Sequence, residues 1–418
     1  MNRILLISLL FISWHFSLFG QEKLQFTNSE QSHFDIPFEI SQNLIILPAR
    51  INGSGIMKFI LDSGITNTII TEMTGVDTVT LKLAREVQLE GLGEGKALTA
   101  WYSDKNELLI ESPLIGGRGI IGKEMEVFVI PEDRFEFSKQ FGLQINGLIG
   151  ADFFTHYVVE INYLEKLISF NKRDDYNFAW KTRRHRRIPL LIENKRPYLA
   201  VKMIQEDGPD IMLKLLVDTG ASMSMWLSLF SDQNIKLPEI TFPALLGQGL
   251  NGNIVGVNGR IKGVKIGPFS INHPIVAFPD SIAIAGMMSE TDRNGTLGNE
   301  VLKRFHVIFD YQGQQCFLKP NKKFHYPFNY NRSGLEIEKP FYNLPIYQIY
   351  NVVKGSPADL SGLMIGDQIE MMNFLQAVNL ELDQINSILY GTEGKVIRMR
   401  VKRDGIIHKA KFTLDSKL

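Results

Sequence analysis

The sequence predicts a mainly β protein made of two related halves, with a smaller, separate unit behind them. Short runs of β-branched and aromatic residues, broken by Gly, Pro and Asn, dominate both halves and favour strands over helices. One series of motifs occurs twice before Pro320, and a different pattern follows that residue. A chain of 418 residues is also longer than a single hydrophobic core usually supports.

In each half an apolar run ends in Asp, a hydroxyl residue and Gly. The first copy is Asp62-Ser63-Gly64, and the second, 156 positions later, is Asp218-Thr219-Gly220. One such motif alone is more often a structural turn, because Asp close to Gly is common in turns. Two copies in the same context indicate an internal duplication that places each carboxylate on a tight turn at the end of a strand.

Two further motifs follow in the same order. A glycine loop recurs at the same offset, at Gly91 and Gly93 and again at Gly247 and Gly249. An apolar pair followed by Gly recurs at an offset of 148, at residues 148–150 and 296–298. The change of offset places a length difference between these two motifs, which surface loops of duplicated domains tolerate. Short helices are expected after the second motif, at about residues 151–155 and 300–304.

The first residues resemble a cleavable export signal. A polar start with Arg3 precedes an apolar run that ends near Phe19, and the chain becomes polar from Gly20 onward. A single membrane anchor is the alternative, but the run is short for a bilayer span and contains Trp14 and His15. We therefore expect a signal peptide at residues 1–20 and an exported chain without stable membrane insertion.

The composition favours no charged partner and no metal. Lys and Arg together number 45, as do Asp and Glu, so the balance gives no electrostatic reason to expect nucleic acid or an anionic membrane as partner. Cys316 is the only cysteine, which excludes an intramolecular disulfide and a cysteine-rich metal site. It is expected to be a buried residue in a strand. The eight histidines show no zinc-binding spacing, and we expect neither a metal nor another cofactor.

The paired aspartates suggest acid–base chemistry. Two close carboxylates cannot both ionise, so one keeps a proton while the other can act as a base toward a water between them. The hydroxyls of Ser63 and Thr219 are expected to bond backbone across the junction and hold both turns. Gly64 and Gly220 are expected to let the backbone approach the carboxylates closely.

From about Phe34 to Pro320 the chain resembles the retropepsin-like aspartic proteases, duplicated in one polypeptide. The resemblance implies a two-lobed pepsin/retropepsin-like acid protease β-barrel fold. It also implies a monomeric protein that acts on protein or peptide substrates. In this family the aspartates are catalytic, the glycine loops form flaps over the substrate, and the apolar pair packs beneath the catalytic turn. We expect an N-terminal lobe at residues 21–180 and a C-terminal lobe at 181–325, with the basic run 181–187 marking the boundary.

The last part of the chain predicts a strand, a capped short helix, a second helix and two strands. Ser356 and Pro357 fit a helix start, residues 380–390 fit the second helix, and residues 396–401 and 406–413 fit strands. Residues 355–367 resemble the PDZ domains common in bacterial envelope proteases, which implies a PDZ-like domain at 335–418 and a periplasmic or extracellular location. PDZ domains bind peptide ends, and the receiving loop is expected at Leu344, Pro345 and Ile346. A module that only orients the protease is the alternative.

Two functions from different classes remain open from the sequence. The first is an aspartic endopeptidase that activates water with Asp62 and Asp218. The second is a catalytically inactive protein that binds peptides on the same scaffold. Both aspartates and both neighbouring hydroxyls are present, which favours the enzyme.

Overall fold

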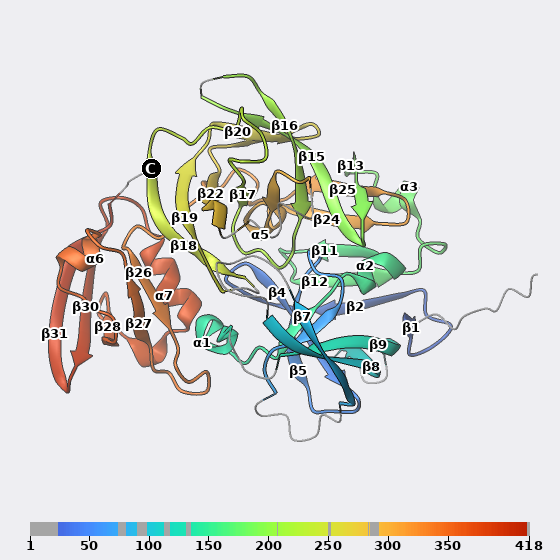
Figure 1. Ribbon diagram of the computed structural model, residues 1–418, viewed down its shortest axis with the longest axis horizontal. Coiled ribbons are helices and arrows are strands. Elements are labelled where there is room, and N and C mark those ends of the chain that lie inside the picture. The colour runs from blue at the N-terminus through green and yellow to red at the C-terminus, as the bar shows by residue number, and fades with distance from the viewer. Residues whose placement is uncertain are drawn as a thin grey trace, which may run out of the picture.

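The computed structural model describes residues 24–73, 81–89, 98–112, 118–130, 135–206, 208–249, 252–282, 284 and 292–415. Two β-rich lobes lie side by side, and the C-terminal unit lies to one side of them (Figure 1). The expected signal peptide and the glycines at 91 and 93 lie outside the described residues. No helix within these ranges is long and apolar enough to cross a membrane.

The first lobe forms a sheet in the order β1-β9-β6-β10-β5-β4-β8-β7, with β3 paired to β4. Its strands are β1 (Leu24–Phe26), β3 (Glu39–Ser41), β4 (Leu44–Ile51), β5 (Met57–Leu61), β6 (Thr68–Ile70), β7 (Leu83–Leu89), β8 (Leu98–Glu111), β9 (Gly119–Val129) and β10 (Gly147–Ile149). Strand β5 leads into Asp62, and β10 runs parallel beside it. Such a parallel pair buries both strands, which explains their continuous apolar runs.

The second lobe repeats this arrangement in the order β18-β19-β22-β17-β23-β16-β15-β20-β21, with β14 paired to β15. Its strands are β14 (Leu191–Glu193), β15 (Arg196–Ile204), β16 (Ile211–Val217), β17 (Met225–Leu227), β18 (Thr241–Gly249), β19 (Gly252–Arg260), β20 (Gly263–Ile266), β21 (Phe269–Asn272), β22 (Ile275–Pro279) and β23 (Gly295–Leu297). Strand β16 leads into Asp218, and β23 runs parallel beside it. The strands around the two aspartates therefore follow corresponding orders, β9-β6-β10-β5-β4 in the first lobe and β22-β17-β23-β16-β15 in the second.

Helices in the lobes are short. They include α1 (Phe137–Phe141), α2 (Asp152–His156), α3 (Phe178–Lys181) and α5 (Asn299–Leu302). Helices α2 and α5 follow the apolar-pair motif in each half, within two residues of the expected bounds. Each begins after the strand that lies beside an aspartate turn.

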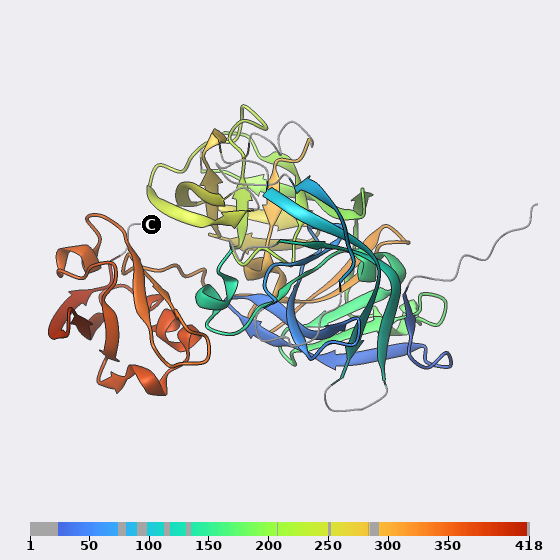
Figure 2. The same ribbon diagram turned by 60° about the horizontal axis from the view of Figure 1, so that its bottom comes forward.

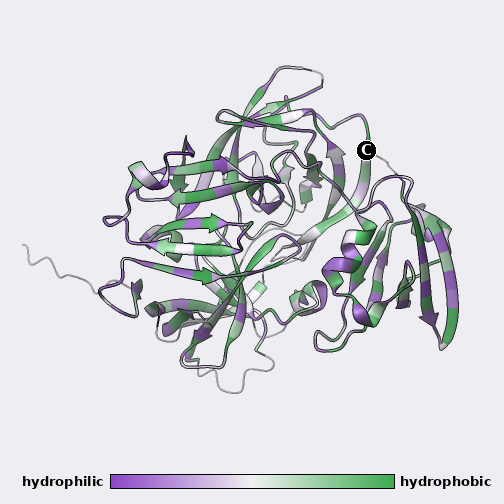
Figure 3. Cartoon of the chain, turned by 180° about the vertical axis from the view of Figure 1, so that it is seen from behind, coloured by the Kyte–Doolittle hydropathy of each residue, from purple (hydrophilic) through white to green (hydrophobic). Residues whose placement is uncertain are grey.

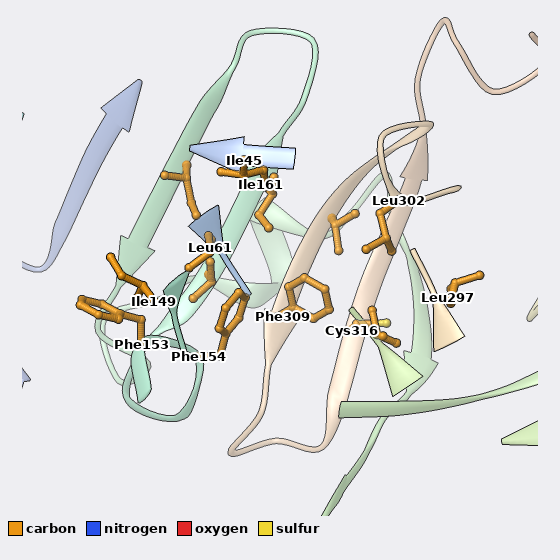
Figure 4. Packing of buried hydrophobic residues seen from close by; sticks show 14 of the residues in the cluster. Ile45, Leu61, Ile149, Phe153, Phe154, Ile161, Leu297, Leu302, Phe309 and Cys316 are labelled. Atoms are coloured by element: carbon orange, nitrogen blue, oxygen red, sulfur yellow. The ribbon is translucent and has the colours of Figure 1, made fainter. Parts of the chain in front are cut away.

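A third sheet joins the two lobes, in the order β13-β25-β24-β11-β12-β2. Its strands are β2 (His33–Pro37), β11 (Val158–Asn162), β12 (Leu167–Asn171), β13 (Arg186–Pro189), β24 (Phe305–Asp310) and β25 (Gln315–Pro320). The end of the basic run lies in the edge strand β13. Strands β11 and β24 pair antiparallel across the junction, and Cys316 is buried in β25. Figure 4 shows Leu61 and Phe154 of the first half near Phe309 of the second, so one hydrophobic core spans both lobes.

His185, just before β13, and His306 in β24 make the stability of the fold pH-dependent. His185 is buried, and its Nε2 lies 3.3 Å from Nδ1 of His306. Burial, then His306 and Lys319, lower the pKa of His185 from 6.5 to about 4. The unfolded chain therefore binds a proton more readily, and stability should fall by up to about 3 kcal/mol as the pH drops from about 6.5 to about 4.

We expect denaturant unfolding of the wild type to show this loss, and His185→Phe, which cannot take up a proton at that position, to show a flatter pH dependence. Equal slopes for the two proteins between about pH 6.5 and pH 4 would assign the acid sensitivity to other groups.

The C-terminal unit has its own sheet, in the order β26-β27-β28-β30-β31 with β29 paired to β28. Its elements are β26 (Leu335–Glu338), β27 (Gln348–Val352), α6 (Pro357–Leu360), β28 (Gln368–Met372), β29 (Leu375–Gln376), the 3-10 helix η1 (Ala377–Asn379), α7 (Leu382–Leu389), β30 (Val396–Arg403) and β31 (Ile406–Thr413). The expected helices and strands are present, and the Ser356 hydroxyl caps α6 by accepting from the Asp359 amide. Hydrophobic and hydrophilic residues alternate along the strands (Figure 3), and the apolar ones form a separate core.

The boundary between this unit and the second lobe lies later than the sequence suggests. Phe328 is buried in the core of the lobes, beyond the expected end at residue 325. Its ring lies 3.6 Å from the guanidinium of the buried Arg304. Tyr330 stacks on Phe242 of β18, with ring centroids 5.0 Å apart. The segment 324–330 is therefore part of the lobe rather than a free linker.

The C-terminal unit also contacts the first lobe, next to α1 (Figure 2). The Lys339 amide, just after β26, donates to the carbonyl oxygen of Lys139 in α1 at 2.9 Å. Asp383 in α7 accepts from the Gln42 amide at 3.3 Å and from the Ser41 hydroxyl at 3.4 Å. These contacts place the unit against the lobe that carries Asp62.

Candidate active site

The two turns that carry Asp62 and Asp218 meet at the junction of the lobes. The carboxyl groups share a side-chain hydrogen bond, and Asp62 is only 7% exposed. A Cβ at Gly220 would lie 2.3 Å from Cγ of Asp62, and one at Gly64 would lie 2.9 Å from Cγ of Asp218. Real side chains do not fit at such distances, so both glycines are needed for the approach. The two halves therefore form one site.

Hydroxyl groups lock the turns to each other. Thr219 Oγ1 accepts from the Ser63 amide at 3.0 Å and donates to the Leu61 carbonyl at 2.8 Å. Ser63 Oγ accepts from the Thr219 amide at 3.0 Å and donates to the Val217 carbonyl at 2.8 Å. Both side chains are fully buried. These are the cross-junction bonds expected from the sequence, and they satisfy backbone groups that the turns would otherwise leave unpaired.

The strands beneath the turns hold the aspartate backbone. The Asp62 amide donates to the Ile149 carbonyl at 2.9 Å, and the Asp218 amide donates to the Leu297 carbonyl at 3.0 Å. This placement of the apolar-pair motif agrees with the family resemblance. Asn146 and Asn294, which open the motif, each accept from a backbone amide of the strand leading to Asp, at Lys58 and Lys214. The repeat contains these asparagines, but spacing alone did not reveal their role.

The surroundings of the two carboxyl groups differ. Burial and then the charge of Asp218 raise the pKa of Asp62 well above its usual value. Burial also raises the pKa of Asp218, but the Gly220 amide, the bond to Asp62 and the positive charge of Arg293 oppose that rise. Arg293 is buried beside the ring of Trp226, 5.4 Å from its centroid. This asymmetry favours a protonated Asp62 beside an ionised Asp218.

The glycine loops can be placed in part. In the second lobe, β18 and β19 form an antiparallel hairpin in which Gly249 pairs with Gly252, and a bulge lies between Leu245 and Gly247. Gly247 has a φ of 150°, which a residue with a side chain rarely adopts. In the first lobe, β7 and β8 pair up to Leu89 and Leu98, and the predicted loop between them is outside the described residues. The role of both hairpins as substrate flaps remains a prediction.

The expected peptide-receiving loop of the C-terminal unit connects β26 to β27. Leu344 and Pro345 are exposed there, and Ile346 is partly buried. Strand β26 is an edge strand of its sheet. Before it, the Arg332 amide donates to the Leu389 carbonyl at the end of α7. A role for Leu344, Pro345 and Ile346 in binding a peptide end remains a prediction.

Across the described residues, no group of three or more His, Cys, Asp or Glu side chains is arranged to hold a metal ion. The polar groups at the paired turns are carboxylates, hydroxyls and backbone amides that bond to one another. Their arrangement suits proton transfer to and from a bound water.

The chain has a mainly β, two-lobed fold consistent with the pepsin-like fold, and Asp62 and Asp218 lie where the lobes meet. Residues 207–301 match a family model described as aspartyl protease. This segment contains Asp218, Thr219 and Gly220. The match supports a protease-type function in general.

Solved structures of seed globulins are also similar to this chain. Conglutin gamma, a basic 7S globulin from lupine seeds, is 11% identical with a TM-score of 0.41, over 69% of this chain and 95% of that one. Basic 7S globulin from soybean is 10% identical with a TM-score of 0.38, over 71% of this chain and 97% of that one. A comparison with curated proteins gave no significant match.

Proposed function

We propose that this protein is an aspartic endopeptidase that hydrolyses peptide bonds with a water activated by Asp62 and Asp218. The observation that carries the proposal is the meeting of the two Asp turns, with their carboxyl groups in hydrogen-bond contact at a largely buried junction. Each half of the chain supplies one aspartate, so the two carboxyl groups can meet only if both halves contribute to a single active site. The family match over the second half supports the same reading.

The different surroundings of the carboxyl groups support a division of roles between them. Asp218, as the ionised member, takes a proton from the water. At the same time the water oxygen attacks the carbonyl carbon of the scissile bond. Asp62, as the protonated member, donates its proton to the carbonyl oxygen. The tetrahedral intermediate then returns that proton to Asp62, the leaving nitrogen takes a proton from Asp218, and the C–N bond breaks. Both carboxyl groups end in their starting states.

The experiment is a digest by purified protein that lacks residues 1–20. An unstructured protein and a peptide library are incubated with it from about pH 3 to pH 8, and new termini are identified by mass spectrometry. We expect internal cleavage of both substrates. Saturable peptide binding without new termini at any pH would instead support the inactive peptide-binding protein.

We further propose that the chain is exported, acts as a monomer in a bacterial periplasm or outside the cell, and binds peptide or protein ends through its PDZ-like C-terminal domain. The export layout of residues 1–20 and the motif at 355–367 support these assignments. A separate core supports treating the C-terminal unit as an accessory domain.

Deleting the chain after Tyr330 should leave cleavage of short peptides within about twofold of the full-length enzyme and reduce cleavage of protein substrates. A tethered binding domain raises the local concentration of a long substrate, which a short peptide does not exploit. The cut must follow Tyr330, because an earlier cut after Asn321 removes Phe328 from the lobe core. The measurement is kcat/KM of both proteins on both substrates. Equal losses on both would mean that the unit supports the lobe through its contacts with α1.

A further inference from the structure

The second catalytic turn has a side-chain support that the first turn does not share. Asn299 is completely buried, and its Nδ2 donates to the carbonyl oxygen of Thr219 at 2.6 Å. Its Oδ1 accepts from the hydroxyl of Tyr163 at 2.6 Å. Tyr163 follows β11 in the first half and is 2% exposed. A chain of two buried hydrogen bonds thus runs from the first half to the turn that carries Asp218.

The corresponding position in the first half carries no amide. Asn299 and Ala151 both follow the glycine of the apolar-pair motif. Their backbones make the same bond, since the Asn299 amide donates to Ala221 at 2.8 Å and the Ala151 amide donates to Ile65 at 2.9 Å. The methyl group of Ala151 cannot bond to the Ser63 carbonyl. The two halves therefore share this backbone geometry and differ in the side chain.

The two tyrosines that follow β11 and β24 contact different turns. Tyr163 follows β11, and its hydroxyl is bonded to Asn299, which holds the second turn. Tyr311 follows β24, and its buried hydroxyl lies beside the Ser63 side chain of the first turn and interacts with both aspartates. Tyr176 is the better control for Tyr163, because its buried hydroxyl interacts with Glu160 of β11 and with neither aspartate turn.

A second side chain from the first half also bonds to the turn that carries Asp218. Asn43, in the turn between β3 and β4, donates to the Ser222 carbonyl at 2.9 Å and to the Glu300 carboxylate at 3.0 Å. The corresponding turn of the second half carries Lys195, which bonds the Asp152 carboxylate at 2.8 Å. The turn from Asp218 to Ser222 is therefore held by the amide side chains of Asn299 and Asn43 at two of its carbonyl groups.

We propose that Asn299, oriented by Tyr163, is a positioning residue that fixes the Asp218 turn, so that the Asp62 turn is the more adaptable of the two. The inference rests on the proposed function, in which Asp218 is the base that must meet the water at a fixed distance. An amide bonded at both ends has one orientation, and fixing the turn carbonyl fixes the backbone next to the base. Proton donation by Asp62 tolerates more adjustment, because its partner oxygen belongs to the substrate.

The test compares Tyr163→Phe with Tyr176→Phe, each of which removes one buried hydroxyl and keeps the ring. We expect Tyr163→Phe to lower kcat by about two- to tenfold, the worth of a typical hydrogen bond, with KM within about twofold. Tyr176→Phe should leave both constants near wild type, because its hydroxyl interacts with Glu160 and not with either turn. Asn299→Ala, which reproduces the side chain of Ala151, should lower kcat at least as much as Tyr163→Phe.

Amide hydrogen exchange gives a readout that does not depend on turnover. Exchange in residues 218–222 should become faster in Tyr163→Phe and Asn299→Ala, with residues 62–66 little changed. Tyr176→Phe should leave exchange in both segments unchanged. Equal kcat losses in the two Tyr→Phe variants, or equal acceleration in both turns, would overturn the positioning role. A wild type without turnover would refute the proposed function. The exchange comparison alone would then decide whether Asn299 and Tyr163 hold the turn at residues 218–222.

Discussion

Replacing either Asp62 or Asp218 by Asn should abolish peptide cleavage without destabilising the fold. Asn keeps the size of the side chain but can neither take the proton of the water nor donate one as a carboxylic acid. We expect kcat to fall by at least about 10³-fold for each variant, since each removes an essential acid or base. The measurement is kcat on a cleaved peptide, with protein purified in the same way and active-site occupancy checked by peptide binding.

Whereas activity should fall in Asp62→Asn, the stability of the fold should stay the same or rise. Burial and the charge of Asp218 raise the pKa of Asp62 well above 3.8, the value for an unperturbed carboxyl group. The folded chain therefore holds a proton that the unfolded chain has released, and wild-type stability falls as the pH rises above about 3.8. Asn is neutral at every pH, so the variant should match or exceed the wild type at about pH 7. The advantage should shrink as the pH falls toward about 4.

Unfolding by denaturant at both pH values checks this expectation. A free energy of unfolding well below wild type at neutral pH would mean that the carboxyl pair is a structural feature. Cleavage that persists in both Asn variants would remove the aspartates from the proposed mechanism.

Thr219→Val should destabilise the protein by about 2 to 5 kcal/mol and lower cleavage strongly. Valine has nearly the shape of threonine, but it removes the hydroxyl that pairs with the Ser63 amide and the Leu61 carbonyl. Both backbone groups lie at a buried junction, and each unsatisfied buried group costs about 1 to 3 kcal/mol. The loosened turns would also separate the carboxyl groups, so kcat should fall more than KM rises.

The matched control is Thr413→Val, the same change at an exposed position of β31 in the C-terminal unit. Surface changes of this kind usually stay within about 0.5 kcal/mol. Free energies of unfolding and kcat of the two variants decide the matter. Similar small effects for both would show that the hydroxyl bridge between the turns contributes little.

The paired turns could be predicted from the sequence because their signals are local. Asp62 and Asp218 each lie in a contiguous motif after an apolar strand, and the copy at a constant offset reveals the partner. The hydroxyl bridge followed from the same reasoning, since a residue next to the aspartate in both copies must lie at the junction when the aspartates meet. Capping at Ser356 and the strands of the C-terminal unit were also readable, because caps and alternation depend on neighbours in the sequence.

Other features required packing information. The end of the second lobe depends on packing, because the sequence gives no sign that Phe328 contacts Arg304 and belongs to the lobe core. Arg293 carries no motif, and only the fold brings its positive charge close enough to oppose the rise in the pKa of Asp218. The attachment of the C-terminal unit to α1 joins surfaces whose sequences give no sign of each other.

The sequence by itself determined the duplication, the two aspartate turns and the hydroxyls that join them, because each is encoded in residues close together in the chain and written twice. Only the tertiary structure decided how the two copies differ. Tyr163 and Asn299 are 136 positions apart, and their bond depends on how the joining sheet packs one half against the other. Repetition reveals what the halves share, whereas a contact present in only one half leaves no repeated pattern to find.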